Sequence, residues 1–245
     1  FISFIWGLMF IVCAAVFSIQ SIALDPDFYT TRYEQMELAS DLNVSNQDLN
    51  DSIIVLLDYI QDERQNMDIT ITRNGQAVEA FNTKEKTHMV DVKALYQNAI
   101  TVGIVCFVFM IGILVYFFVK EKKLMISYLS KGMIQASICL GIVLLFFGMW
   151  IAYDFTGFWT WFHTVFFSND LWLLDPRTDF MICMLPEIIF NQLVISIIIE
   201  FVLMVAIALA FSIYYQFKKA PIGFDRKMNL ILASKSPRRK EILSN

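Results

Sequence analysis

Two histidines, His88 and His163, are the side chains of this 245-residue chain best suited to moving protons near neutral pH. His88 stands three residues before Asp91, a spacing that places both on one face of a helix and lets a carboxylate orient an imidazole. Both histidines have acidic residues nearby and lie within about three helical turns of a long apolar segment. The pattern predicts an acid–base pair at one depth, with two ordinary interfacial histidines as the alternative.

A metal site is a competing use of the same side chains. Two histidines with Asp91 or Asp179 would supply the three protein ligands of a zinc centre. The chain lacks the short His-x-x-x-His and Cys-x-x-Cys spacings typical of such centres, so we expect no metal and no other cofactor. A haem bound by both histidines would need the two rings to face each other inside the protein, whereas their sequence contexts place them at its edge.

No protein nucleophile is evident either. Residues 1–227 contain no Gly-x-Ser-x-Gly turn, phosphate loop or nucleotide-binding fingerprint, so any acyl transfer here should lack a Ser or Cys nucleophile of the protein. Three of the four cysteines lie in apolar segments, and Cys183 has no second cysteine near it on its side of the membrane. We interpret all four as small packing residues.

These residues are set among long apolar segments. The chain is 57% apolar, and a spanning helix needs ~20 consecutive apolar residues. Four segments qualify, at residues 1–24, 99–119, 133–153 and 191–217. The sequence therefore predicts an α-helical integral membrane protein with four transmembrane helices. The first segment is expected to be an uncleaved anchor, with a signal peptide ending near Ser21-Ile22-Ala23 as the alternative.

Basic residues in short loops predict the orientation of the four spans. The loop at residues 120–132 carries four lysines, and the tail at 218–245 begins with two more. The loop at residues 154–190 has one basic residue, Arg177, and five acidic ones. We expect both termini in the cytoplasm of a bacterium, with residues 25–98 and 154–190 on the outer face of its cytoplasmic membrane.

The first outer segment, residues 25–98, has the signals of a small α+β domain. Ser45 can cap an amphipathic helix at 46–64, and a short helix is expected at 28–38. Alternation over residues 69–78, interrupted by Asn74-Gly75, predicts a β-hairpin because both turn residues tolerate positive φ. A further helix should begin near Thr83 and continue into the second span.

The second outer segment, residues 154–190, is rich in aromatic residues, which favour the headgroup level of a membrane. An aromatic belt alone would not explain the polar residues His163, Asn169 and Asp170 within it. We expect a re-entrant or in-plane helix at the interface that ends at Asp175-Pro176. A short helix capped by Thr178 or Asp179 should follow and run to Leu185.

Glu200 lies in the fourth span, ~10 Å deep at 1.5 Å per residue. A carboxyl group at that depth is costly and is often functional. Two interpretations stay open, a functional carboxyl in a transport path and a protonated carboxyl bonded to a neighbouring helix.

Residues 1 to about 220 resemble the lipoprotein intramolecular transacylases of Gram-positive bacteria. The resemblance is carried by Tyr33-Glu34, Leu57-Asp58-Tyr59, the motif Phe81–Lys93 with His88, the motif Phe162–Asp179 with His163, and Leu185-Pro186-Glu187. It implies a membrane enzyme that moves the sn-2 acyl chain of a diacylglyceryl lipoprotein onto the α-amine of its N-terminal cysteine. Lipoproteins and membrane lipids would be the partners, and nucleic acid would not.

The resemblance agrees with the chemistry of the residues, because an amine nucleophile needs a base rather than a protein Ser. We expect His163 to be the base and His88, oriented by Asp91, to protonate the departing glycerol oxygen, although the two roles could be exchanged. Further side chains are expected to bind the substrate, namely Lys93, Asn169, Asp170, Trp172, Asp175 and Asp179.

Residues 228–243 resemble the start of a Maf-type nucleotide pyrophosphatase, with Ser-x-Ser-Pro-Arg-Arg after a strand-like run. The rest of such a domain is missing, so we expect a longer fusion polypeptide and no pyrophosphatase activity from this piece. Read without that resemblance, the tail is a basic segment facing anionic lipid. Two rival functions also stay open for the whole chain, a non-catalytic membrane adaptor or sensor and a small transporter that uses Glu200.

Overall fold

The computed structural model describes residues 1–219, and the expected pyrophosphatase-like segment at 228–243 lies outside them. Four of its helices are long and apolar enough to cross a membrane: α1 (Ile2–Ala23), α5 (Thr83–Lys120), α6 (Met125–Tyr153) and α9 (Glu187–Lys219). The predicted fold class is confirmed. Large apolar side chains such as Phe109, Ile142 and Ile207 are exposed on these helices, as expected where the surroundings are lipid.

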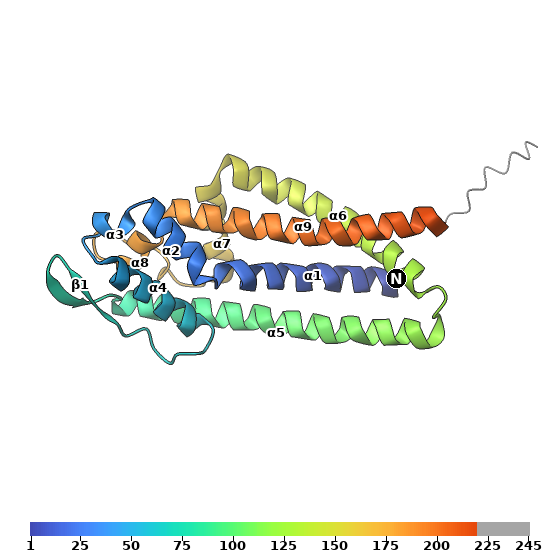
Figure 1. Ribbon diagram of the computed structural model, residues 1–245, viewed down its shortest axis with the longest axis horizontal. Helices are drawn as coiled ribbons and strands as arrows, with labels where there is room; N and C mark the ends of the chain where they lie inside the picture. The colour runs from blue at the N-terminus through green and yellow to red at the C-terminus, as the bar shows by residue number, and fades with distance from the viewer. Residues whose placement is uncertain (220–245) are drawn as a thin grey trace, which may run out of the picture.

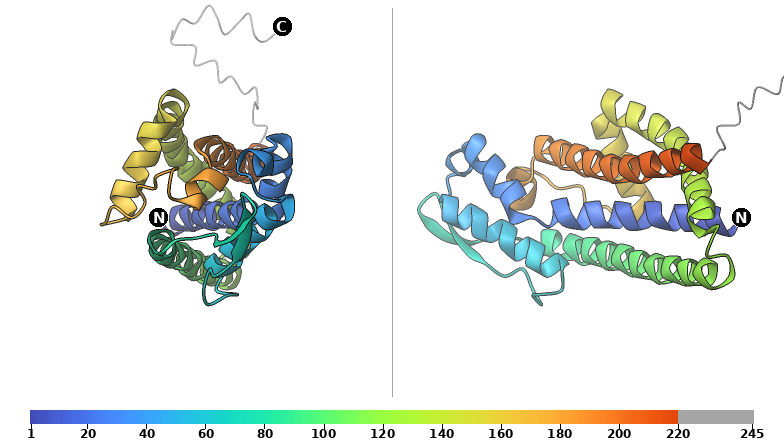
Figure 2. Two further views of the ribbon diagram at one scale, coloured as in Figure 1. Left: turned by 90° about the vertical axis from the view of Figure 1, so that its left-hand side faces the viewer. Right: turned by 45° about the vertical axis from the view of Figure 1, so that its right-hand side comes forward.

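Helix α1 is the central span and contacts α5, α6 and α9, as Figures 1 and 2 show. Its closest approach is to α6, where a Cβ on Gly132 would lie 1.8 Å from the Ser3 carbonyl oxygen. Glycine is needed at position 132 because any side chain there would collide with α1, and small residues let membrane helices pack closely. By contrast, α5 contacts α6 only weakly.

The segment at residues 25–98, named the first outer segment for the side on which it is expected, folds over one end of the bundle, at the left of Figure 1. It contains α2 (Pro26–Gln35), α3 (Leu38–Asp41), α4 (Asn46–Ile60), β1 (Thr70–Arg73) and β2 (Gln76–Glu79). The Ser45 side chain accepts a hydrogen bond from Asp48 N, as predicted for the cap of α4. That helix ends four residues earlier than predicted, and Asp62 after it has a left-handed φ of 67°.

The predicted hairpin is present. β1 and β2 pair antiparallel with Ile71 opposite Val78. The turn residues Asn74 and Gly75 have φ values of 52° and 75°, the left-handed conformation that this dipeptide tolerates. Phe81, Leu49, Ile53, Met67 and Ile71 form the fully buried centre beneath it.

The second outer segment comprises α7 (Phe155–Phe166), irregular turns at 167–179, and α8 (Phe180–Met184). The in-plane helix was predicted to reach Asp175-Pro176, and this was wrong, because α7 ends at Phe166. Phe167 is extended, and the Asn169 side chain accepts from Leu171 N. Such local side-chain bonding competes with the helix. Met184 and Ile189 extend the buried core of the first outer segment, so the two outer segments share one core.

Candidate active site

The two histidines lie side by side where α5 and α7 meet. Their ring centroids are 6.2 Å apart with the rings tilted by 33°. His88 is 6% and His163 7% exposed, so both imidazoles are almost completely withdrawn from solvent. The apolar part of α5 begins near Ala99, which leaves Thr83–Asn98, ~24 Å of helix, outside the expected span. His88 therefore belongs to the part of α5 beyond the end of the bundle.

A hydrogen bond fixes the tautomer of His163. Its Nδ1 lies 2.7 Å from the carbonyl oxygen of Trp159, one turn earlier in α7. A carbonyl oxygen only accepts, so Nδ1 carries the proton and Nε2 of the neutral ring has a free lone pair. The ring also stacks on Trp172, with centroids 4.8 Å apart, and lies edge-on to Trp159. The aromatic residues of this segment thus hold a histidine whose second nitrogen can act as a base.

His88 has no such partner. Its Nδ1 is buried without a hydrogen bond among the described residues, and the ring packs against Phe167. The pKa of His88 is lowered from 6.5 to about 4, chiefly by burial and then by the neighbouring His163, with Asp91 acting in the opposite direction. Burial also lowers the pKa of His163, against the opposing effect of its bond to Trp159. Both rings are therefore neutral near pH 7, and a proton on one disfavours a proton on the other.

Asp91 does not hydrogen-bond to His88, contrary to the orienting role predicted for it. Its Oδ2 accepts instead from the Asn169 amide at 2.8 Å, which ties α5 to the turn after α7. The amide oxygen of Asn169 accepts in turn from Leu171 N. The i, i+3 spacing correctly placed Asp91 near the His88 ring, but the competing donor came from a segment 78 residues away.

A pocket of about 230 Å³ opens next to Phe167, the residue that packs against both imidazole rings, and neither histidine is itself part of the pocket lining. Asp91, Ala94, Leu95 and Asn98 of α5 form one wall, and residues 166–169 form the other. Asp91 is the charged member of this lining, set among apolar and neutral polar groups. A carboxylate near the neutral His88 ring suits a substrate that carries a positive or proton-donating group.

The remaining predicted binding residues are only partly brought together. Trp172 reaches the pair through its stacking on His163. Asp170 is exposed and does not line the pocket, and Asp175 is bonded to Arg177 two residues away. Lys93 faces α4, where it pairs with Asp62 and lies 4.5 Å above the Tyr59 ring. The structure thus separates Lys93, Asp170 and Asp175 from the histidines.

Asp179 proves to be a buried structural residue. Its carboxylate accepts from the Asn82 amide, the Thr178 hydroxyl and Asp175 N, and it lies 3.6 Å from Lys84. It stands at the predicted cap position of α8 but makes no side-chain cap there. Glu85 of α5 supplies that acceptor instead, to Met181 N at 2.6 Å.

Glu85, Asn82 and Lys84 were missed as site residues. Asn82 and Glu85 form a reciprocal capping box at the start of α5, and the Asn-x-x-Glu spacing was a signal for it. Lys84 donates to the Leu173 carbonyl oxygen and so holds the turn that carries Trp172. The long-range partners of these residues were not readable from the sequence.

The structure also bears on the predicted alternatives of a metal site and of a functional carboxyl at Glu200. Within residues 1–219, no three His, Cys, Asp or Glu side chains converge as a metal site would need. Glu200 accepts a hydrogen bond from Ser21 of α1 at 2.8 Å. The carboxyl is thus bonded to a neighbouring helix, as one of its two interpretations expected.

A four-span protein with two buried neutral histidines and a carboxylate beside an open pocket has the architecture of an integral membrane enzyme. The model of the family described as "Lipoprotein intramolecular transacylase Lit" matches residues 4–190. The chain belongs to this family and is therefore a membrane acyltransferase that acts on lipoproteins. No curated protein matches the chain.

Solved structures agree on the fold. The membrane-integral lipoprotein intramolecular transacylase Lit from Bacillus cereus is similar, with a TM-score of 0.72 and 18% identity over 89% of this chain and 95% of that one. Variants of that protein with a histidine replaced by arginine or by alanine give TM-scores of 0.67 and 0.68, each at 18% identity over 89% of this chain and 92% or 93% of theirs. At this identity the likeness is one of fold.

Proposed function

We propose that the protein moves the sn-2 acyl chain of a diacylglyceryl lipoprotein onto the α-amine of its N-terminal cysteine, using His88 and His163 at the outer membrane interface. The observation that carries the proposal is the pair itself, two buried neutral imidazoles 6.2 Å apart beside an open pocket. Intramolecular transfer needs no protein nucleophile, because the amine and the ester are parts of one substrate held in place.

The proposed proton path runs through both rings. The amine nitrogen attacks the ester carbonyl carbon, and the carbonyl oxygen becomes an oxyanion. His163 Nε2, left unprotonated by the bond from Nδ1–H to Trp159 O, takes the proton that the nitrogen loses. The proton then passes from His163 to His88. As the bond from the acyl carbon to the glycerol oxygen breaks, the protonated His88 delivers this proton to that oxygen, and both rings are neutral again.

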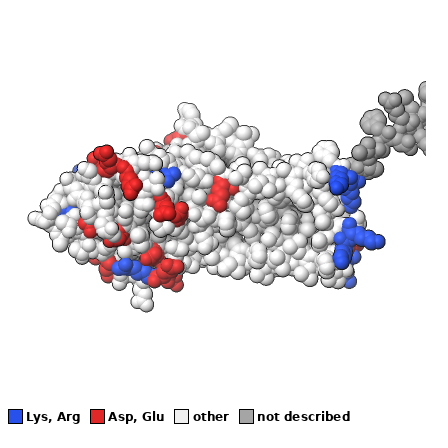
Figure 3. All heavy atoms as spheres, in the orientation of Figure 1, with Lys and Arg blue, Asp and Glu red and all other residues white. Residues whose placement is uncertain are grey.

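The orientation in the membrane is part of the proposal. Figure 3 shows Lys and Arg gathered at the end of the bundle where α9 finishes, and acidic side chains gathered over the opposite end. Basic ends of short loops favour the cytoplasm. The pocket, at the acidic end, would then lie at the outer face, where a lipoprotein emerges.

The weak contact between α5 and α6 suits entry from the lipid. The pocket lies between α5 and the turn after α7. A diacylglyceryl group could keep both acyl chains in the leaflet while its ester bonds reach the histidines.

Mass spectrometry of a reconstituted reaction tests the proposal. Purified protein in lipid nanodiscs is given a synthetic diacylglyceryl lipopeptide with a free cysteine α-amine. The expected product has the same mass as the substrate, with the acyl chain on the amine and one hydroxyl on glycerol, and fragmentation distinguishes the two. If no more N-acyl product forms with the protein than in a protein-free control, the proposal is overturned.

A further inference from the structure

We propose that Asp91 is the binding site for the positively charged α-amine of the substrate's N-terminal cysteine, rather than a residue that orients His88. The inference rests on the proposed function for the identity of the substrate. Its own support is the geometry around the Asp91 carboxylate. Neither the family match nor the fold by itself gives this carboxylate a role.

The Asp91 carboxylate is held in place through one of its two oxygens, and, among the described residues, the other oxygen is free to accept a hydrogen bond. Asn169 donates to Oδ2 at 2.8 Å and is itself fixed by Leu171 N. No donor of the described residues reaches Oδ1. A positioned carboxylate with one free oxygen is the group that a primary ammonium prefers, because charge-assisted hydrogen bonds are stronger than neutral ones.

The pocket around Asp91 provides no competing cation. None of its eight lining residues is basic, and its other polar members, Asn98, Ser168 and Asn169, are neutral. The three lysines nearest in sequence are engaged elsewhere. Lys93 pairs with Asp62, and Lys86 pairs with Asp68 and Glu79. Lys84 binds the Leu173 carbonyl oxygen and Asp179. The negative charge of Asp91 is therefore left for a ligand.

This placement also serves the reaction. An α-amine has a pKa of ~7.7–8.0 and is largely protonated at neutral pH, so it enters as a cation. The ammonium must first release one proton to solvent, because only the neutral amine has a lone pair for attack. Attack on the ester makes the nitrogen positive again, and a carboxylate one helical turn from His88 stabilises that charge. After transfer the nitrogen is an uncharged amide. The ion pair is then lost, which favours release of the product over that of the substrate.

Binding measured without turnover tests the inference separately from the proposed function. The probes are two lipopeptides whose chains are joined to glycerol by ether bonds, so that neither chain can be transferred. One has a free α-amine and the other an N-acetyl group. Wild-type protein in nanodiscs should bind the free amine about tenfold more tightly, the scale of one charge-assisted hydrogen bond.

Asp91→Asn should abolish this preference, because the amide keeps the contact with Asn169 but has no charge. Asp41→Asn, which removes an exposed carboxylate that is not part of the pocket lining, should keep the preference. The readout is a ratio within one variant, so a smaller folded fraction does not imitate the effect. Equal binding of both probes by the wild type, or a preference retained by Asp91→Asn, would overturn the inference. A clear preference in a protein that transfers no acyl chain would instead overturn the proposed function alone.

Discussion

Burial gives the two histidines properties that their residue type alone does not. The ordinary pKa of an imidazole is 6.5. Burial lowers the pKa of both rings of this pair, and the neighbouring His163 lowers that of His88 further, to about 4. In the proposed reaction, Nε2 of His163 accepts a proton at neutral pH and His88 passes it on. The sequence identified both residues, but it did not reveal the tautomer of His163, which is determined by the hydrogen bond from Nδ1 to a carbonyl oxygen of α7.

Replacing either histidine should remove activity without unfolding the protein. General acid–base catalysis contributes about 10²–10⁴-fold in rate, so His88→Ala and His163→Ala should each lower product formation by that factor. Because the two act on one proton path, the double variant should be scarcely worse than either single one. Product is measured by mass spectrometry and folding by thermal melting. Near wild-type product from both single variants would contradict acid–base catalysis by this pair.

The lowered pKa of His88 has a consequence for stability. Between pH 6.5 and about 4 the unfolded chain binds a proton at this ring that the folded chain does not bind. The contribution of the neutral His88 ring to the free energy of unfolding is therefore fully present above pH 6.5 and is lost as the pH falls toward 4. The melting temperature of His88→Gln should drop less than that of the wild type between pH 7 and pH 4.5. Carboxylates titrate alike in both proteins, so parallel curves would show that the ring is not buried neutral.

At the scale of elements, short-range signals were predictable and long-range ones were not. Ser45, Asn74-Gly75 and the start of α5 at Thr83 were read correctly because each depends on residues within four positions. The end of α7 was missed because Asn169 forms a local turn that aromatic content does not reveal.

The candidate site divides in the same way. His88, His163, Asp91, Asn169 and Trp172 lie together, whereas Lys93 lies about 140° around α5 from His88 and faces α4. The motif around His88 consists of residues that are adjacent in the sequence, but a helix places adjacent residues on different faces. That is why the motif predicted more binding residues than the structure gathers.

Glu85 joins the two outer segments, and its loss should destabilise the fold. Its buried carboxylate accepts from Met181 N and Asn82 N. Glu85→Ala would leave both donors unpaired at about 1–3 kcal/mol each, so we expect about 2–6 kcal/mol lower stability. Glu85→Gln keeps one acceptor and should cost less.

Thermal and denaturant unfolding in detergent measure these differences. Glu63→Ala, at an exposed position of the first outer segment, is the control and should change stability little. A Glu85→Ala protein that melts with the wild type would show that α8 is held by apolar packing alone.

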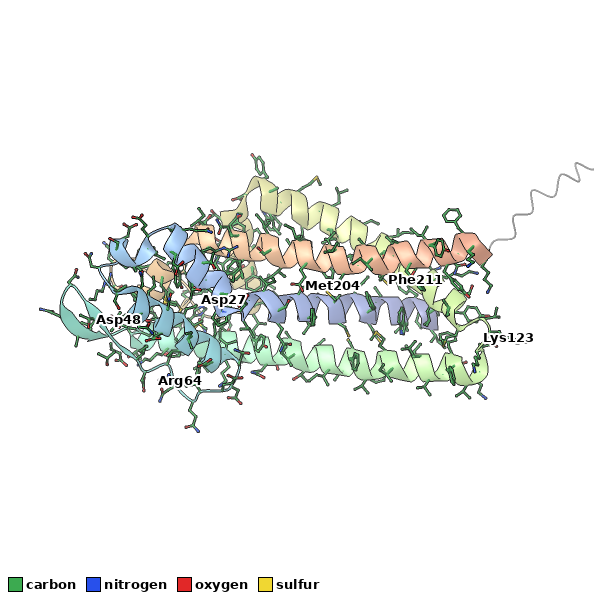
Figure 4. The ribbon with its side chains drawn as sticks, viewed as in Figure 1. Asp27, Asp48, Arg64, Lys123, Met204 and Phe211 are labelled. Carbon is green, nitrogen blue, oxygen red and sulfur yellow. The ribbon has the colours of Figure 1, made fainter. Side chains whose placement is uncertain are left out.

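For the molecule as a whole, the distribution of charge and the position of the pocket agree. Figure 4 places Asp48 and Arg64 over the outer segments, Met204 and Phe211 along α9, and Lys123 at the far end. The apolar length between them is the part that lipid must cover. The pocket thus lies near the acidic end of the molecule and the lysine-rich loop at the other end (Figure 3), with α1 packed through the middle.

Cysteine labelling in intact cells tests this orientation. With the four native cysteines replaced, a single cysteine at Asn74 should react with a membrane-impermeant maleimide, because the hairpin turn would lie outside. A single cysteine at Lys122, in the short α5–α6 loop, should react only after the membrane is opened. The physical reason is the cost of moving a lysine-rich loop across the membrane against the positive-inside preference. Labelling of Lys122→Cys in closed cells would reverse the topology and place the pocket in the cytoplasm, where no translocated lipoprotein could reach it.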